Sequence, residues 1–247
     1  MMPVTRRYVT ACETSSSEGT RMSMQDKGFR RLNPYFSWFM FLLFGPLFKV
    51  YFRLTCKKDR QRLNTLTAQS RPLIIVFNHT SYLDVPVVGL CLGIRFMRRV
   101  TLPGKKELFD DKKTRWLVNL AGAVPLDRDM ADSSAARTLL RALRGGQHVL
   151  MAPEGTRSAD GEVQPFKPGF IKLAHKAKAI ILPVGIQGAA QALPRGASFP
   201  KPRKIRVTVG EPIDPLNVLG DKVSSADALR VAELVRQSIL DLVAGDR

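Results

Sequence analysis

The chain has 247 residues, 45% of them hydrophobic, so it can bury one substantial core and is neither disordered throughout nor fibrous. Lys and Arg number 39 against 21 acidic residues, and the formal net charge of +18 favours an anionic partner such as a membrane surface, a phosphorylated substrate or nucleic acid. The three cysteines are widely spaced and form no Cys-x-x-Cys pair. They indicate neither a disulfide framework nor a zinc knuckle, and a reducing, cytosol-facing setting fits best.

The first 27 residues are rich in Ser, Thr and charged side chains and contain no apolar run of the kind found in secretory signals. We therefore expect residues 1–27 to form a disordered tail.

Residues 28–60 contain a strongly aromatic stretch, Pro34 to Phe52, with basic residues before and after it. As a helix, its uncharged part from Pro34 to Phe48 would be about 22 Å long, shorter than the ~30 Å hydrocarbon core of a bilayer. Gly45-Pro46 is also expected to break it. The stretch predicts a helical segment that associates with an anionic membrane surface in a monotopic or peripheral way rather than spanning it. A buried core helix of a soluble protein is the alternative.

From residue 61 to residue 247, short apolar runs alternate with helical patterns. This alternation predicts an α/β domain with a mostly parallel central sheet covered by helices on both faces. The expected strands are residues 72–77, 94–102, 123–126, 147–152, 180–185 and 205–209. The expected helices are residues 82–92, 108–121, 133–144, 169–179 and 224–243.

Polar residues follow four of these strands. If the strands are parallel, their carboxyl ends share one edge of the sheet, where open α/β sheets generally bind ligands. A candidate base, several cations and a Gly-containing turn would then meet in one crevice suited to a reaction on a hydroxyl beside a phosphate, which Arg can hold bidentately. The residues that follow the strands are Asn78-His79, Gly104-Lys105-Lys106, Asp127-Arg128 and Pro153-Glu154-Gly155-Thr156-Arg157.

His79 and Asp84 fall in the predicted turn between the first strand and its helix. Taken alone, such a histidine is more often a structural residue, Asp84 could simply favour the helix N-terminus, and Arg128 and Arg157 could be surface cations. The joint occurrence favours a site. His148, inside an apolar strand, and His175, in a lysine-rich helix, are expected to be structural or solvated.

Several blocks together resemble the glycerolipid acyltransferases, the family that includes 1-acylglycerol-3-phosphate (lysophosphatidic acid) O-acyltransferases. Asn78 to Asp84 is similar to their His-x4-Asp signature. The similarity covers residues 77–185 in the family's order, although Asp110 to Arg115 replaces an apolar stretch with Pro and Gly found in many members. The further matching blocks are Lys105 to Phe109, Gly122 to Arg128, Pro153 to Ser158, Phe166 to Gly169 and Ile181 to Val184.

The resemblance implies that residues 61–247 form a catalytic domain for phospholipid biosynthesis. It would transfer a fatty acyl group from acyl-CoA or acyl carrier protein to the sn-2 hydroxyl of 1-acylglycerol-3-phosphate, giving phosphatidic acid. The enzyme would lie at the cytoplasmic membrane with its active site facing the cytoplasm.

In this reading His79 is the general base and Asp84 fixes its tautomer, as in the serine hydrolase triad. The expected substrate-binding residues are Arg157, supported by Arg128, on the acceptor phosphate; Lys105 on phosphate or oxyanion; Gly155 and Thr156 as possible amide donors; and Glu154 either on Arg157 or on the acceptor.

No metal-ligand cluster, Walker loop or dinucleotide fingerprint is visible, so neither a metal nor a cofactor is predicted. The first alternative function is acyl transfer to another lyso-lipid, such as a lyso-aminolipid or another lysophospholipid. The second, from a different class, is a catalytically inactive basic module that binds membranes or nucleic acid. Because no aromatic and basic nucleic-acid motif accompanies the charge, nucleic acid is not the expected partner.

Overall fold

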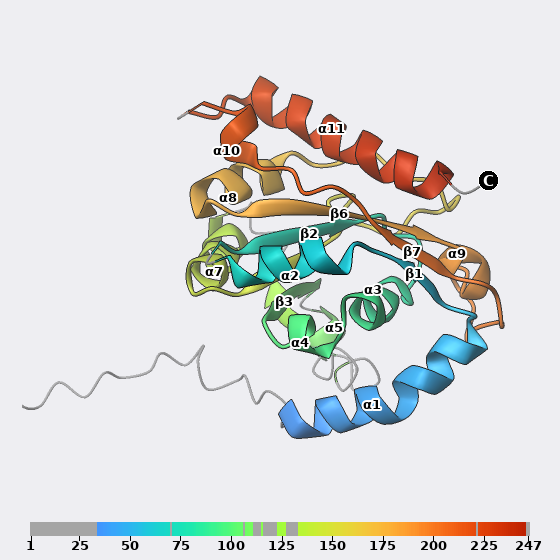
Figure 1. Cartoon of the computed structure of the whole chain (residues 1–247). Coiled ribbons are helices and arrows are strands. Elements are labelled where there is room, and N and C mark those ends of the chain that lie inside the picture. The colour runs from blue at the N-terminus through green and yellow to red at the C-terminus, as the bar shows by residue number, and fades with distance from the viewer. Residues whose placement is uncertain are drawn as a thin grey trace, which may run out of the picture. The chain divides into compact units, whose positions relative to one another are not determined.

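The structure is a computed structural model that describes residues 34–69, 71–105, 107–110, 115, 123–126, 133–220 and 222–245. The tail predicted at residues 1–27 lies outside these residues. The described strands form one seven-stranded sheet in the order β1-β7-β6-β2-β5-β3-β4 (Figure 1). Their bounds are β1 Thr55–Lys57, β2 Leu73–Phe77, β3 Val100–Lys105, β4 Ala123–Leu126, β5 His148–Met151, β6 Ile180–Gln187 and β7 Arg206–Val209.

Five neighbouring strands, β6, β2, β5, β3 and β4, run parallel to one another. β7 is antiparallel to β6, and β1 pairs with β7 in parallel. The predicted mostly parallel sheet is therefore confirmed, and the carboxyl ends of β2 and β5 are neighbours at one edge.

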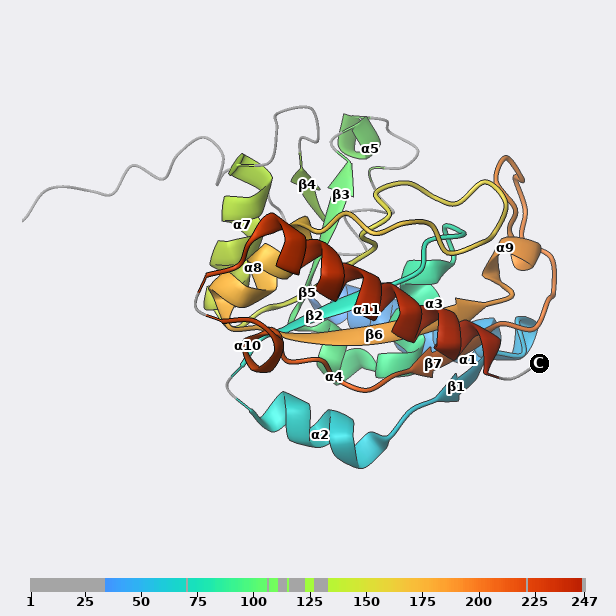
Figure 2. The same cartoon turned by 90° about the horizontal axis from the view of Figure 1, so that it is seen from above.

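Helices cover both faces of the sheet, as the sequence predicted. α7, α8 and α11 pack on one face, with α11 running across β6 (Figure 2), while α2 and α3 pack on the other. The described helices are α1 Pro34–Tyr51, α2 Arg60–Ala68, α3 Asp84–Leu92, α4 Ile94–Met97, α5 Glu107–Asp110, α7 Ser133–Arg144, α8 Gly169–Ala177, α9 Ala189–Ala192, α10 Pro215–Val218 and α11 Ser225–Ala244.

β2 is the centre of the core. All five of its side chains are buried, with Leu73, Ile75 and Phe77 facing one layer of helices and Ile74 and Val76 facing the other. Burying one such side chain fully is worth about 1.5–3 kcal/mol. β2 therefore gives the turn that follows it a firmly packed base.

The strand predicted at residues 94–102 is wrong in its first half. α3 ends at Leu92 and is followed by Gly93, whose φ is +95° and whose carbonyl accepts hydrogen bonds from Phe96 and Met97. These bonds form the short helix α4, and β3 begins only at Val100. Buried Phe96 stacks on the ring of His148, with ring centroids 4.9 Å apart, so tertiary packing holds the helical turn.

The expected break at Gly45-Pro46 is also wrong, because α1 continues through both residues. Gly45 is buried, and a Cβ at this position would lie 3.0 Å from a methyl carbon of Leu90 in α3. The missing side chain thus allows α1 to pack closely on α3. Among the described helices, none is both long enough and apolar enough to cross a bilayer.

The helix predicted at residues 108–121 is described only in part. Glu107–Asp110 forms α5, and most of the remaining residues lie outside the described part of the chain.

Candidate active site

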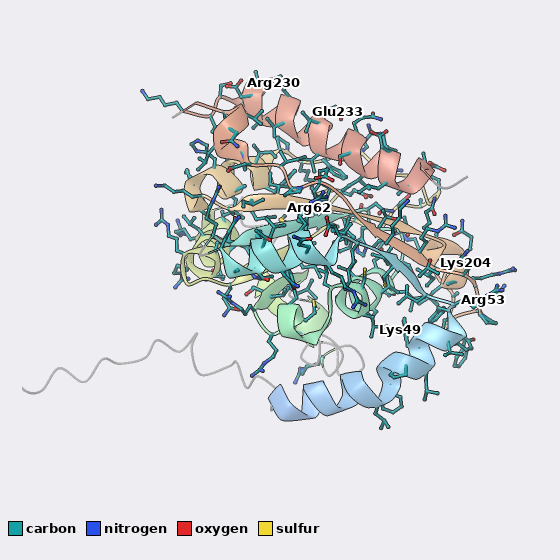
Figure 3. All side chains as sticks on the ribbon, viewed as in Figure 1. Lys49, Arg53, Arg62, Lys204, Arg230 and Glu233 are labelled. Carbon is teal, nitrogen blue, oxygen red and sulfur yellow. The ribbon has the colours of Figure 1, made fainter. Side chains whose placement is uncertain are left out.

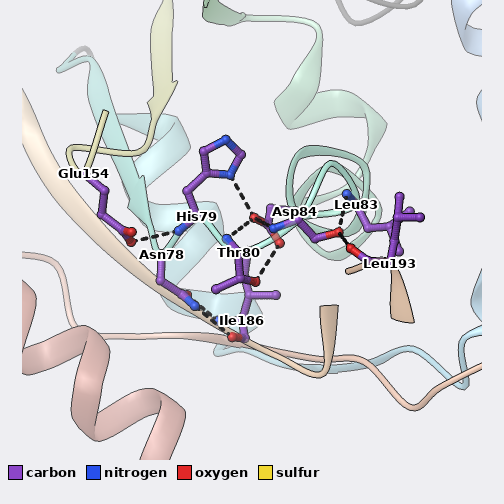
Figure 4. A network of polar contacts seen from close by, with 9 residues as sticks. Asn78, His79, Thr80, Leu83, Asp84, Glu154, Ile186 and Leu193 are labelled. Atoms are coloured by element: carbon purple, nitrogen blue, oxygen red, sulfur yellow. Dashed lines mark hydrogen bonds and ion pairs between the residues drawn. The ribbon is translucent and has the colours of Figure 1, made fainter. Parts of the chain in front are cut away.

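The turn after β2 is fixed to the neighbouring strand by Asn78. Its buried side-chain amide donates from Nδ2 to the carbonyl oxygen of Ile186 at 2.9 Å, and its Oδ1 accepts from the N–H of Ile186 at 2.8 Å (Figure 4). A two-way bond of this kind reproduces a strand pairing with a side chain. The backbone of His79, the next residue, is therefore held against β6.

His79 and Asp84 are in direct contact, as the sequence predicted they would be if both served one site. Nδ1 of His79 lies 2.9 Å from Oδ2 of Asp84. A carboxylate only accepts hydrogen bonds, so this contact places the proton on Nδ1 and leaves the lone pair on Nε2. Figure 4 shows the second ring nitrogen pointing away from Asp84, and the His79 side chain keeps 25% of its surface exposed. The imidazole can therefore accept a proton from outside.

Asp84 is fully buried at the first position of α3. Burial raises the pKa of its carboxyl group, while hydrogen bonds from His79, Ser81 and Thr80 act in the opposite direction. Its Oδ2 accepts from the N–H of Thr80 at 2.7 Å and of Ser81 at 2.8 Å. These donors and the start of the helix favour the carboxylate form that orients His79.

Glu154 supports the same histidine from the next strand. It follows β5, and its Oε1 accepts the backbone N–H of His79 at 2.9 Å. Burial raises the pKa of Glu154 to about 7. Its Oε2 is also buried and has no hydrogen-bond partner among the described residues. Glu154 thus contacts the backbone of His79, a contact that the sequence did not predict.

The turn after β5 also holds His79 from its other side and carries Arg157. The N–H of Ser158 donates to the carbonyl oxygen of His79 at 2.8 Å. The guanidinium carbon of Arg157 lies 3.7 Å from the ring centroid of Tyr82, which belongs to the His79 turn. This cation–π contact keeps the Arg157 charge beside the histidine. No separate role was predicted for Tyr82 from the sequence; the available signal was an aromatic residue inside the His-x4-Asp spacing.

Gly155 and Thr156 lie between Glu154 and Arg157. Gly155 has a φ of +83°, and its N–H donates to Ala152 at 3.2 Å. A Cβ on Gly155 would lie 3.1 Å from Nζ of Lys167, so the missing side chain leaves room for a further cation. Thr156 is exposed.

The side chains of two predicted cations, Lys105 and Arg128, lie outside the described part of the structure. Lys105 is the last residue of β3, at the same edge of the sheet as the other strand ends, but its side chain lies outside the described part of the structure. Arg128 lies outside the described residues altogether.

The other two histidines lie in structural contacts. Nδ1 of buried His148 accepts the N–H of Leu73 at 3.1 Å, and burial lowers the pKa of His148 to about 4. Nε2 of His175 lies 3.0 Å from the carbonyl oxygen of Gly220. Within the described residues, no group of three His, Cys, Asp or Glu side chains could hold a metal ion.

Comparison with known proteins relates this geometry to one family. The model of the family described as Acyltransferase matches residues 55–187. The chain is 29% identical over 161 residues to a chloroplastic 1-acyl-sn-glycerol-3-phosphate acyltransferase of Brassica napus, covering 64% of this chain and 45% of that protein. It is 34% identical over 94 residues to the lyso-ornithine lipid O-acyltransferase of Rhodobacter capsulatus, covering 38% and 32%. The chain thus spans half or less of the length of these relatives.

A solved structure has the same fold. The 1-acyl-sn-glycerophosphate acyltransferase PlsC of Thermotoga maritima superimposes with a TM-score of 0.56 at 24% sequence identity, over 87% of this chain and 94% of that one.

Proposed function

Since the chain belongs to the acyltransferase family, we propose that it transfers a fatty acyl group to the sn-2 hydroxyl of 1-acylglycerol-3-phosphate, giving phosphatidic acid in phospholipid biosynthesis. The acyl donor is a thioester, either acyl-CoA or acyl carrier protein. The observation that carries the proposal is the 2.9 Å contact between His79 and Asp84 in the turn after β2, inside the matched region.

His79 acts as the general base. Its Nε2 takes the proton of the acceptor hydroxyl as the hydroxyl oxygen attacks the thioester carbonyl carbon. The tetrahedral intermediate then collapses, the carbon–sulfur bond breaks, and the thiolate leaves with the proton that His79 held. Asp84 stabilises the imidazolium between these two steps. The acceptor itself supplies the nucleophile, so no serine or cysteine of the protein is acylated.

Cations on the strand ends bind the acceptor phosphate. Arg157 is the principal phosphate ligand because Tyr82 holds its guanidinium beside the His79 turn. Lys105 and Arg128 add charge for the phosphate or for the oxyanion of the intermediate. Gly155 and Thr156 line the acceptor site between Glu154 and Arg157.

Glu154 is a positioning residue. Its Oε1 fixes the backbone of His79, and with a pKa of about 7 it carries a proton on part of the molecules at neutral pH. When Glu154 is protonated, its Oε2–H is a hydrogen-bond donor, while its Oε1 still accepts from the backbone of His79.

The reaction takes place at an anionic cytoplasmic membrane surface, with the site facing the cytoplasm and α1 as a monotopic or peripheral contact. Over residues 43–51, the part of α1 whose side chains are described, one face is exposed and apolar, and Lys49 and Arg53 lie at its carboxyl end (Figure 3). Apolar side chains next to cations are typical of interfacial helices. The exposed face consists of Leu43, Phe44, Leu47, Val50 and Tyr51.

In this proposal residues 28–60 associate with the membrane, residues 61–247 are catalytic, and residues 1–27 form a tail. The division is one of function and not of folding, because β1, within residues 28–60, pairs with β7 of the catalytic part.

The test measures phosphatidic acid formed by the purified chain in vesicles with acyl-CoA and 1-acylglycerol-3-phosphate. H79A should lose activity by a factor of about 10² to 10⁴, the usual contribution of a general base, without loss of folding. H175A is the matched control and should keep full activity. Full activity in H79A would remove the proposed mechanism.

Acyl transfer to a lyso-ornithine lipid is the second candidate, since a relative with that name is 34% identical over 94 residues. A panel of acceptors at equal surface concentration separates the two. If the acceptor carries a phosphate, R157A should raise the KM for that acceptor and leave activity on a phosphate-free acceptor unchanged. A preference of the unsubstituted chain for the phosphate-free lipid would favour the second candidate.

A further inference from the structure

The loop between α9 and β7, residues 193–205 and here called the basic loop, combines an exposed aromatic side chain with exposed cations. Phe199 is 82% exposed, the largest fraction among the exposed large hydrophobic side chains of the described residues. The basic loop contains no acidic residue. Its cations are Arg195, Lys201, Arg203 and Lys204, and all four are exposed. The basic loop therefore presents one exposed aromatic side chain together with four exposed cations.

The basic loop is held in place by backbone hydrogen bonds. The N–H of Ala197 donates to Pro194 at 3.1 Å, which closes a turn with Gly196 at a φ of +85°. The N–H of Lys201 donates to Ala192 at 2.7 Å and closes the base of the loop. These hydrogen bonds fix the backbone of the basic loop, from which the exposed side chain of Phe199 projects.

The basic loop is continuous with the exposed face of α1. The hydroxyl of Tyr51, a member of that face, donates to the carbonyl oxygen of Pro200 at 2.9 Å. The N–H of Ile205 donates to the carbonyl of Phe52 at 3.0 Å. Figure 3 shows Lys204 close to Arg53, at the same end of the molecule as Lys49. The basic loop and the carboxyl end of α1 are therefore adjacent, and both carry exposed apolar side chains and exposed cations.

The same loop is tied to the catalytic turn. Oγ of Ser81 donates to the carbonyl oxygen of Leu193, the first residue of the basic loop, at 2.9 Å. Ser81 also donates its N–H to Asp84, the partner of His79. A partner that binds the basic loop is therefore held at a fixed distance from His79, the proposed base.

We propose that the basic loop is a second membrane contact, in which Phe199 enters the headgroup region of an anionic bilayer and the four cations bind lipid phosphates. This proposal rests on the proposed function at a membrane surface. The neighbouring apolar face of α1 makes lipid the fitting occupant, since that face offers little to a nucleic acid. With α1 and the basic loop both on the bilayer, the site takes up lyso-lipid in one orientation.

The decisive experiment is quenching of tryptophan fluorescence by lipid. The F199W variant is added to vesicles of phosphatidylglycerol and phosphatidylethanolamine that carry bromine on their acyl chains, and its quenching is compared with that of the unsubstituted chain, which has two tryptophans. We expect additional quenching and a blue shift of emission. L229W is the matched control, because Leu229 is 55% exposed on α11, on the other face of the sheet. Equal quenching in F199W and L229W would overturn the proposal.

Charge provides a second measurement. The K201Q/R203Q/K204Q variant should bind these anionic vesicles at least about tenfold more weakly, because each basic residue near such a surface contributes severalfold in affinity. The matched triple variant K172Q/K176Q/R230Q, on α8 and α11, should bind like the unsubstituted chain. Equal weakening in both triple variants would mean that only the total charge matters, and the basic loop would lose its assigned role.

The same samples separate this proposal from the proposed function. Acyl transfer is measured with a short-chain acceptor that stays monomeric in solution, for which membrane contact is not needed, so F199W should match the unsubstituted chain. Quenching in F199W without any acyl transfer by the unsubstituted chain would leave the membrane contact standing and remove the enzyme function. Acyl transfer without additional quenching would do the reverse.

Discussion

The backbone N–H of His79 donates to Oε1 of Glu154 at 2.9 Å, so a carboxyl group with a pKa of about 7 supports the main chain of the proposed base. The contact exists because β2 and β5 are parallel neighbours, with Val76 opposite Met151, and both chains turn just beyond this pair. Two residues 75 positions apart thereby share one corner of the sheet edge.

Glu154 should make the stability of the protein depend on pH near neutrality. Because burial raises the pKa of Glu154 in the folded protein, the folded protein binds this proton more tightly than the unfolded chain does. This contribution is fully present below the ordinary pKa of a glutamate, about 4.3, and is lost as the pH rises through about 7. E154Q, which resembles the protonated form, lacks this loss.

Urea unfolding of the wild type and E154Q between pH 5 and pH 8.5 measures the effect. The free energy of unfolding of E154Q should rise relative to the wild type as the pH increases, by at most about 3 kcal/mol, since one pKa unit corresponds to ~1.4 kcal/mol. E233Q, at an exposed glutamate that pairs with Arg236, supplies the control and is unfolded under the same conditions. A pH-independent difference for E154Q would mean that Glu154 is ionised throughout this range.

Catalysis by His79 should depend on the charge of Asp84 and not only on its shape. Oδ2 of Asp84 accepts from Nδ1 of His79 and from the N–H groups of Thr80 and Ser81, so in D84N the amide oxygen can take this place and keep all three contacts. The neutral amide lacks the negative charge that stabilises the imidazolium, so His79 becomes a weaker base toward the acceptor hydroxyl. We expect kcat to fall by about 10² to 10⁴ with little change in KM for the acceptor. D160N, at an exposed carboxylate, is the control; near-normal kcat in D84N would show that the charge of Asp84 does not support the base.

Tyr82 should act through Arg157. Y82F keeps the aromatic ring under the guanidinium, whereas Y82L removes it. An exposed cation–π contact is worth about 0.5–1 kcal/mol, so Y82L should raise the KM for the phosphorylated acceptor about twofold to fivefold, with kcat unchanged. Y82F should stay within error of the wild type. Equal KM values for Y82L and Y82F would mean that the ring does not position Arg157.

The buried centre of the sheet could be predicted from the sequence, whereas the edge strand β1 could not. β2, β5 and β6 are nearly continuous runs of buried apolar residues, which is the pattern of strands covered on both faces. β1 has three exposed residues and exists through its pairing with β7, about 150 residues later in the chain. No pattern in the local sequence predicts such a strand.

The site follows the same rule. The contact between His79 and Asp84 could be predicted because both residues lie within one turn, where spacing alone sets their distance. The support of His79 by Glu154 could not, because it depends on the register between β2 and β5. The position of Arg157 depends on its contact with the ring of Tyr82, which lies in a different turn. The spacing of residues along the chain does not predict such a contact.

Gly188, which precedes α9 and contacts the basic loop at Lys204, should not tolerate a side chain. Gly188 has a φ of +81°, and a Cβ there would collide with the carbonyl oxygen of Lys204, so both backbone strain and overlap with a neighbouring backbone oppose substitution. Gly196, with a φ of +85° at the exposed turn of the same loop, has nothing within 4 Å of the corresponding Cβ position. G196A should therefore cost only the ~1–2 kcal/mol of a left-handed alanine.

G188A should lower the free energy of unfolding clearly more than G196A does, as measured by urea denaturation of both variants. The reason is that Lys204 is held beside Ile205, whose N–H donates to the carbonyl of Phe52. Equal costs would mean that Lys204 moves away freely, and a loop that yields so easily could not hold Phe199 at a set distance from Ser81 and the catalytic turn.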